Sequence, residues 1–154
     1  MENVLVNSFV FLFERELGKL QTEIEQYPDE KLLWQTAGQI SNPPGTLCLH
    51  LCGNLQNYIG ATLGKSGYVR NRPYEFAARG LTKQQLLDEI SRTKASTIAA
   101  LTKLHDADLH RQYPEEVLGY PMTTVFFLNH LFGHFGYHLG QINYHRRMIS
   151  ACQV

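Results

Sequence analysis

The chain has 154 residues, of which 44% are hydrophobic and 18% are charged. This composition excludes a disordered chain and favours one compact soluble domain over residues 1–154. The 14 basic and 14 acidic side chains cancel, which leaves no excess of positive charge for binding phosphates. We therefore expect no nucleic-acid partner, because such binding needs a concentrated basic face.

Cysteine usage and hydropathy bear on the compartment. Cys48, Cys52 and Cys152 form no even disulfide framework, and a chain of this size needs none, so we expect free thiols and a cytoplasmic protein. The first apolar run is broken by Glu14 and Arg15 and lacks the basic start of a signal peptide. No run of about 18 apolar residues occurs, so we expect no membrane partner.

The first half of the chain predicts two helices. Residues 4–26 carry apolar side chains at three- and four-residue steps, with charged side chains on the other faces, and Pro28 ends this amphipathic helix. Asn42 followed by Pro43 is typical of a helix start, and the pattern then predicts a second helix to about Gly64.

A long connection and a third helix follow. Residues 65–80 mix Gly, Pro, Arg and aromatic residues without a period, so they predict a crossover that permits the second and third helices to run parallel. Thr82 with Gln85 resembles a capping box and predicts the start of the third helix, which should end near His105.

The last segment completes the predicted fold. Residues 106–122 form another long connection, after which Thr123 can cap a fourth helix that reaches about Ile149. Four long helices and no convincing strand predict an all-α protein, specifically a four-helix bundle with long crossover connections.

The second and fourth helices differ from the other two in charge. The second contains no Asp, Glu, Lys or Arg, and the fourth contains none from Pro121 until Arg146. A helix without a charged face is usually buried, so we expect a second copy of the chain to cover these two helices in a homodimer. Five glycines within them predict close helix approach: Gly53, Gly60, Gly133, Gly136 and Gly140.

Four of the seven histidines fall on the fourth helix. At 100° per residue, His130, His134 and His138 share one face, and His145 follows almost two turns later. His130 and His138 are about 12 Å apart along the axis, too far to bind one ion readily. An i, i+4 pair can bind one ion, so the candidate pairs are His130 with His134 and His134 with His138.

A third imidazole is available on the uncharged second helix at His50. Three neutral histidines leave a coordination position open, as in catalytic rather than structural zinc sites. A single histidine in a helix is more often an ordinary core or surface residue. Several buried on a nearly uncharged helix would, however, cost about 1–3 kcal/mol each if unpaired, which favours shared ligation.

Other known metal patterns are missing from these helices. The stretch around the histidines has no carboxylate, so it lacks both the Glu-x-x-His of di-iron bundles and the HExxH of metalloproteases. Side chains that could edge the same cavity are Asn54, Asn57, Tyr58, Tyr137 and Tyr144, and arginines that could recognise an anionic substrate are Arg70, Arg72, Arg146 and Arg147. Ordinary packing and solvation are the more frequent roles of such residues.

The second helix, TLCLHLCGNLQNYIGATLG, the fourth, HFGYHLGQINYHRR, and the connection RNRPYEFAARGLTKQQLL resemble the DinB-like superfamily, the DinB and YfiT group of metal-dependent proteins. The connection resembles a branch of unassigned function. The resemblance spans nearly the whole chain and implies a bundle in up, down, down, up order, commonly dimeric, that holds one divalent ion. It implies the ligands His50, His134 and His138, leaves His130 as a reserve ligand, and places Gln141 beside the last ligand.

The resemblance also favours thiol chemistry. It implies a metal-dependent S-transferase that uses a small-molecule thiol and an electrophilic substrate, with zinc or nickel as the first choice of cofactor and iron, cobalt or manganese as further choices. A metal-dependent hydrolase and a non-catalytic metal-binding stress-response module are the alternatives. The sequence identifies no general base, because neither ligand-bearing helix has an acidic residue near the histidines.

Overall fold

The computed structural model describes residues 3–152, which are helical apart from their connections and contain no β-strand. The prediction of an all-α protein is therefore confirmed. The four long helices are α1 (Val4–Glu25), α2 (Pro44–Leu55), α4 (Lys83–Leu101) and α6 (Thr124–Ala151). The short helical elements are η1 (Glu30–Trp34), η2 (Gln56–Ala61), α3 (Arg72–Ala77) and α5 (Asp106–Leu109).

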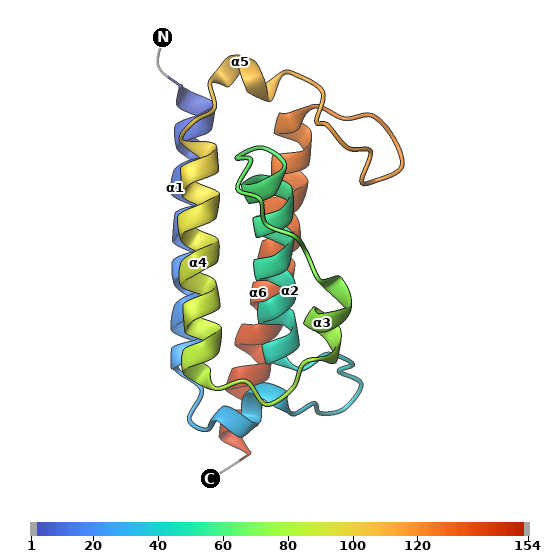
Figure 1. The fold of residues 1–154 in the computed structure, drawn as a ribbon. Coiled ribbons are helices and arrows are strands. Elements are labelled where there is room, and N and C mark those ends of the chain that lie inside the picture. Colours follow the sequence, from blue (N-terminus) through green and yellow to red (C-terminus); the bar gives the residue numbers. More distant parts are fainter. Residues whose placement is uncertain (1–2, 153–154) are drawn as a thin grey trace.

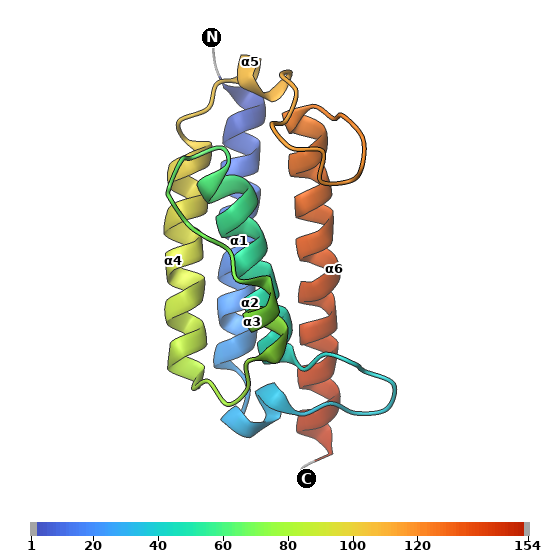
Figure 2. The ribbon, with the colours of Figure 1, turned by 45° about the vertical axis from the view of Figure 1, so that its right-hand side comes forward.

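The four long helices lie side by side along one axis (Figure 1). In the view of Figure 1, α1 and α6 run downward along the chain, whereas α2 and α4 run upward. Both α1 and α2 pack against α4 and α6. The turned view in Figure 2 shows α3 lying across α2, outside the four long helices.

Helix α1 buries one apolar stripe and is capped from far along the chain. The core side chains on this stripe are Val6, Phe9, Phe13, Leu17, Leu20 and Ile24. The carboxylate of Asp106 accepts hydrogen bonds from the amides of Leu5 (3.2 Å) and Val6 (3.0 Å). These amides lack partners within the helix, so Asp106 stabilises the start of α1 and ties it to α5.

Helix α2 begins one residue later than predicted and ends earlier. Pro43 occupies the N-cap position and Pro44 the first turn, where a missing amide hydrogen costs nothing. The α-helix stops at Leu55 and continues as the π-helical turn η2, in which Thr62 donates its amide to the carbonyl of Asn57 at 3.0 Å. Such π turns are frequent near functional sites.

The crossover that follows explains why α2 is uncharged. All twelve residues of α2 are buried, and α3 packs against it. The connection was predicted to be irregular, but it contains α3, whose start is capped by the Asn71 side chain accepting from the Tyr74 amide at 3.1 Å. The chain itself therefore covers this face of α2, so the prediction that a second copy covers it was wrong.

The starts of α4 and α6 agree with the sequence predictions. Thr82 and Gln85 form a reciprocal capping box, with the Gln85 amide donating to Thr82 Oγ1 at 3.1 Å and the Thr82 amide donating to Gln85 Oε1 at 2.8 Å. Helix α4 ends at Leu101, before the predicted His105, and residues 106–109 form the separate helix α5. Thr123 caps α6 through the Phe126 amide at 3.3 Å.

Helix α6 owes its lack of charge to a different cause. Its outer face exposes large apolar side chains, namely Phe126, Tyr137, Tyr144 and Met148. Added Cβ atoms at Gly133, Gly136 and Gly140 would meet nothing within 4 Å, so close approach does not explain these glycines within the chain. It does explain Gly53 and Gly60, which lie against side chains of Glu75 and Ser96.

Across residues 3–152, no helix combines the length with the apolar character that crossing a bilayer requires.

Candidate metal centre

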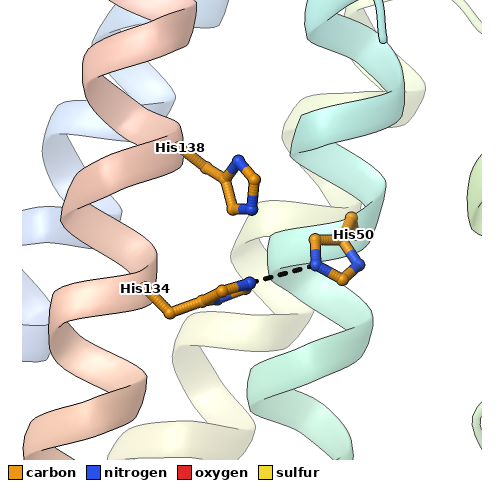
Figure 3. Close-up of side chains that lie close together, drawn as sticks. All are labelled: His50, His134 and His138. Atoms are coloured by element: carbon orange, nitrogen blue, oxygen red, sulfur yellow. Dashed lines mark hydrogen bonds between the residues drawn. The ribbon is translucent and has the colours of Figure 1, made fainter. Parts of the chain in front are cut away.

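Three histidines from two helices converge at one point (Figure 3). His50 comes from α2, and His134 and His138 come from successive turns of α6. One ring nitrogen of each lies within 4.8 Å of the corresponding nitrogens of the other two. Within residues 3–152, this is the single group of three or more His, Cys, Asp or Glu side chains that meets this geometry.

The distances suit a metal ion. His50 Nε2 and His134 Nε2 are 3.1 Å apart. Metal–nitrogen bonds of about 2.0–2.1 Å in a tetrahedron would separate two ligand nitrogens by about 3.3 Å. The three ring centroids are 4.6–5.4 Å apart and the planes are steeply inclined, so the rings face a common centre without stacking.

His50 is fixed by residues of the crossover. Its Nδ1 lies 3.2 Å from Glu75 Oε2 and 3.3 Å from Arg70 Nη2, and the ring of Phe76 packs against it with centroids 5.1 Å apart. Burial opposes ionisation of Glu75, yet hydrogen bonds from His50 and Arg70 lower the pKa of its carboxyl below the usual value. The result is an ionised carboxylate buried beside the outer nitrogen of His50.

His138 is oriented by its own helix. Its Nδ1 lies 2.7 Å from Gln141 Oε1, one turn further along α6. We assign the Nδ1 proton to this hydrogen bond, since the amide oxygen can only accept. The other ring nitrogen, Nε2, then carries a lone pair on the side that faces His50 and His134 (Figure 3).

His134 has the least support from the protein. Its Nδ1 is buried and has no hydrogen-bond partner among the described residues. Burial, reinforced by the neighbouring His138 and His50, lowers the pKa of His134 to about 4, and burial also lowers the pKa of His138. Neutral imidazole is the form that binds metals, so the donor set fits a divalent cation.

The remaining histidines of α6 lie outside this cluster. His130 is exposed and stacks on Phe127, with ring centroids 5.8 Å apart. His145 is buried, and its ring nitrogens contact the Tyr27 hydroxyl at 2.9 Å and the Gln35 carbonyl at 2.8 Å. His145 is therefore a satisfied core histidine, and His130 does not join the three rings.

Sequence reasoning missed Glu75. The prediction that α2 and α6 carry no acidic residue near the ligands is correct, but α3 brings this carboxylate to His50 from outside both helices. No local pattern marks Glu75, because its role depends on how the crossover packs. Arg70, considered as a substrate contact, instead pairs with Glu75 at 2.7 Å and 2.9 Å, and Arg146 pairs with Glu23 at 2.6 Å.

A groove borders the cluster at His138. It lies between residues 39–44 and α6, has a volume of about 540 Å³, and includes His138 and Gln141 in its wall. Apolar and aromatic side chains make up much of the rest, including Leu47, Tyr137 and Tyr144, and no Asp, Glu, Lys or Arg lines it.

The fold and the site define an all-helical protein with a candidate three-histidine metal centre. The family model described as the DinB superfamily matches residues 12–142. The chain therefore belongs to the DinB superfamily, which confirms the resemblance seen in the sequence.

Solved structures agree on the fold. The crystal structure of a DinB-like protein from Bacillus cereus ATCC 10987 superposes with a TM-score of 0.74 and covers 94% of this chain and 92% of its own. The two sequences are 18% identical, so this similarity concerns the fold alone. No curated protein matches the chain.

Proposed function

We propose that this protein is a metal-dependent enzyme of the S-transferase type, in which His50, His134 and His138 hold one divalent cation. The convergence of three imidazole nitrogens within 4.8 Å carries this proposal. Three protein ligands leave a coordination position open, as catalytic rather than structural sites do. When bound, such a cation supplies Lewis acidity, which lowers the pKa of a thiol or a water molecule beside it.

Zinc or nickel is the proposed cofactor, because imidazole suits both ions, and iron, cobalt and manganese are weaker candidates. The thiol would be a small molecule from solution. Cys48 and Cys52 are buried in the core, and Cys152 is exposed near the end of α6, so none of the three belongs to the group of converging side chains. In the proposed reaction the thiol loses its proton to solvent, its sulfur bonds to an electrophilic carbon, and the leaving group departs with the electron pair.

The groove beside His138 supports binding of the electrophile. Its uncharged wall favours a substrate with an apolar or aromatic part, since no charged group is present to pair with an ionic substrate. Asn54 lies one turn after His50 on α2, and its Oδ1 is buried with no partner among the described residues. We propose Asn54 as a further polar contact of the bound molecule, because a buried oxygen without a hydrogen-bond partner is unfavourable.

Glu75 is not the general base of this proposal. Its carboxylate contacts the outer nitrogen of His50 and is held by Arg70, so it faces away from the open side of the cluster. The proposal consequently uses no acidic side chain for proton transfer. A solution thiol that ionises at the site needs none.

Three further expectations belong to the proposal. We propose that the chain is a single domain with helices in the up, down, down, up order, which the directions of the long helices in Figure 1 support. We also propose a homodimer, which the exposed apolar face of α6 supports. The cytoplasm is the proposed compartment, on the grounds of the free thiols.

The test uses protein loaded with zinc or nickel. Consumption of 1-chloro-2,4-dinitrobenzene is measured with cysteine, with glutathione and without thiol, beside the matched variant His134→Ala. We expect turnover that requires both metal and thiol and is lost in the variant. Metal-dependent hydrolysis of an ester such as p-nitrophenyl acetate without thiol would replace the proposal by a hydrolase. Metal-dependent folding without any turnover would replace it by a non-catalytic module.

A further inference from the structure

The crossover of residues 65–80 places a buried ion pair, Arg70 with Glu75, beside the candidate ligand His50. Glu75 on α3 is 4% exposed, and Arg70, five residues earlier, grips its carboxylate with two hydrogen bonds, Nε to Oε1 at 2.7 Å and Nη2 to Oε2 at 2.9 Å. A bidentate pair of this kind fixes the position of the carboxylate as well as its charge. Burying an unpaired carboxylate would be costly, so the arginine makes this placement possible.

The pair meets the candidate ligand His50 at the nitrogen that faces away from the other two histidines. Glu75 Oε2 lies 3.2 Å from Nδ1 of His50. Arg70 Nη2 lies 3.3 Å from the same nitrogen, but it already donates to Glu75 Oε2 at the shorter distance of 2.9 Å. Because a carboxylate can only accept, we assign the proton of His50 to Nδ1, donating to Glu75. The lone pair of the ring is then on Nε2, the atom that lies 3.1 Å from His134 Nε2.

The backbone of α2 is shaped to admit this carboxylate. Gly53 lies three residues after His50, and a Cβ atom there would collide with Glu75 Oε1 and lie 2.7 Å from the Glu75 Cδ atom. Glycine is unfavourable within a helix, so its presence here requires a compensating contact. Gly53, Arg70 and Glu75 thus form one arrangement that places a negative oxygen against His50.

We propose that Glu75, held by Arg70, is a positioning residue for the metal centre, which fixes the tautomer and ring orientation of His50 so that Nε2 faces the cation. Histidine ligands commonly donate their second ring N–H to a carboxylate, and this partner orients the ring and strengthens it as a ligand. The inference rests on the proposed metal centre. Because Arg70 neutralises Glu75, the pair orients His50 without adding net charge to the site.

The first experiment measures metal affinity. Zn²⁺ binding is followed by competition with a chelator for Glu75→Ala, Glu75→Gln and Gly53→Ala. We expect affinity to fall by about 10- to 100-fold in Glu75→Ala, and less in Glu75→Gln, whose amide oxygen can still accept from Nδ1. Gly53→Ala should also weaken binding, because the methyl group displaces the carboxylate without removing it.

The matched control is Glu16→Gln. Glu16 is also buried and ion-paired, with Arg15 and Lys19 each at 2.8 Å, but it lies on α1 and both of its partners belong to that helix. The zinc affinity of Glu16→Gln should equal that of the unmodified protein. Circular dichroism confirms that each variant is folded before its affinity is compared.

The second experiment needs no metal. Long-range proton–nitrogen NMR correlations report which nitrogen of His50 carries the proton in the metal-free protein. We expect the Nδ1–H form in the unmodified protein and in Glu16→Gln, and a mixture of tautomers in Glu75→Ala. This readout moves only if Glu75 acts on the ring, and a merely structural role would leave it unchanged.

The outcomes separate the two proposals. If the unmodified protein binds zinc and neither Glu75→Ala nor Gly53→Ala changes the affinity or the tautomer, the positioning role is wrong and the metal centre stands. If the unmodified protein binds no metal while Glu75→Ala still shifts the tautomer, the metal centre is wrong, whereas the action of Glu75 on the His50 ring stands.

Discussion

The two ligand-bearing helices are uncharged for opposite reasons. Every residue of α2 is buried, because α3 and the crossover lie against it. Helix α6 buries only its inner stripe and exposes aromatic side chains and three open glycines on the other side. An uncharged helix is therefore ambiguous in a sequence, since the same composition results from cover by the chain itself and from an open apolar face.

This difference extends to the candidate ligands. His50 on α2 is held from behind by a buried carboxylate and an arginine, whereas His138 on α6 is held by one amide side chain and His134 by no side chain at its Nδ1. The groove also opens along α6. The structure thus has a fixed side at α2 and an accessible side at α6, which suits the proposed binding of a substrate.

The largest expected effect is a difference in stability between substitutions on the buried and the exposed face of α6. Phe135 has 0% exposure, and Phe135→Ala should lower the free energy of unfolding by about 3–5 kcal/mol, because it leaves a cavity in the core. Tyr137 is 67% exposed, so Tyr137→Ala should lower the free energy of unfolding of the monomeric chain by less than about 0.5 kcal/mol. Urea denaturation of both variants measures the contrast. Equal losses would contradict an open outer face.

The next effect compares glycines on the two helices. Gly53→Ala should destabilise the protein by about 1–3 kcal/mol, since the new methyl group collides with buried Glu75. Gly136→Ala should stabilise it by about 0.5–1 kcal/mol, because nothing lies within 4 Å of the added atom and alanine is the better helix former. Thermal unfolding of each variant provides the measurement. The same sign for both changes would show that the two helices do not differ as described.

The smallest effect concerns pH and the core histidine of α6. Burial lowers the pKa of His145, while the hydrogen bond to the Gln35 carbonyl opposes this shift. The folded protein therefore binds a proton at His145 less readily than the unfolded chain does. This contribution to stability is complete above the unfolded pKa of 6.5 and is lost as the pH falls below it towards the folded pKa.

The pH prediction is tested in metal-free protein by denaturation at several values between about pH 7 and 5. The free energy of unfolding of the unmodified chain should fall as the pH is lowered across this range. That of His145→Gln should fall less, because glutamine does not titrate. Glu75 and the three converging histidines are the same in both proteins, so their contributions cancel in the comparison. If the free energy of unfolding of His145→Gln depends on pH as steeply as that of the unmodified chain, His145 does not contribute to the pH dependence.

The sequence predicted most of the fold because its signals are local. The apolar period of α1, the reciprocal cap of Thr82 and Gln85, and the Thr123 cap all depend on residues within a few positions of one another. The short helices α3 and α5 were missed, since each has few residues and depends on contacts with distant segments. Asp106, for example, caps α1 from about a hundred residues away.

For the candidate site, too, the sequence predicted the features that depend on local spacing but not those that depend on distant contacts. The spacing of His134 and His138 places them on one face of a helix, and family resemblance selects His50 as their partner across the bundle. The support of His50 was not predictable, because Glu75 and Arg70 lie on a connection without a period. The cover of α2 was also misjudged, since composition does not reveal that α3 packs against it from outside the bundle.

The most direct test of the central claim is metal content per chain after zinc loading, measured by elemental analysis. The proteins to compare are the unmodified chain, His50→Ala, His134→Ala, His138→Ala and the control His130→Ala, which removes an exposed histidine of the same helix. The account predicts about one ion per chain in the unmodified protein and the control, and a large loss in the other three variants. Undiminished zinc in His50→Ala and His134→Ala would contradict it.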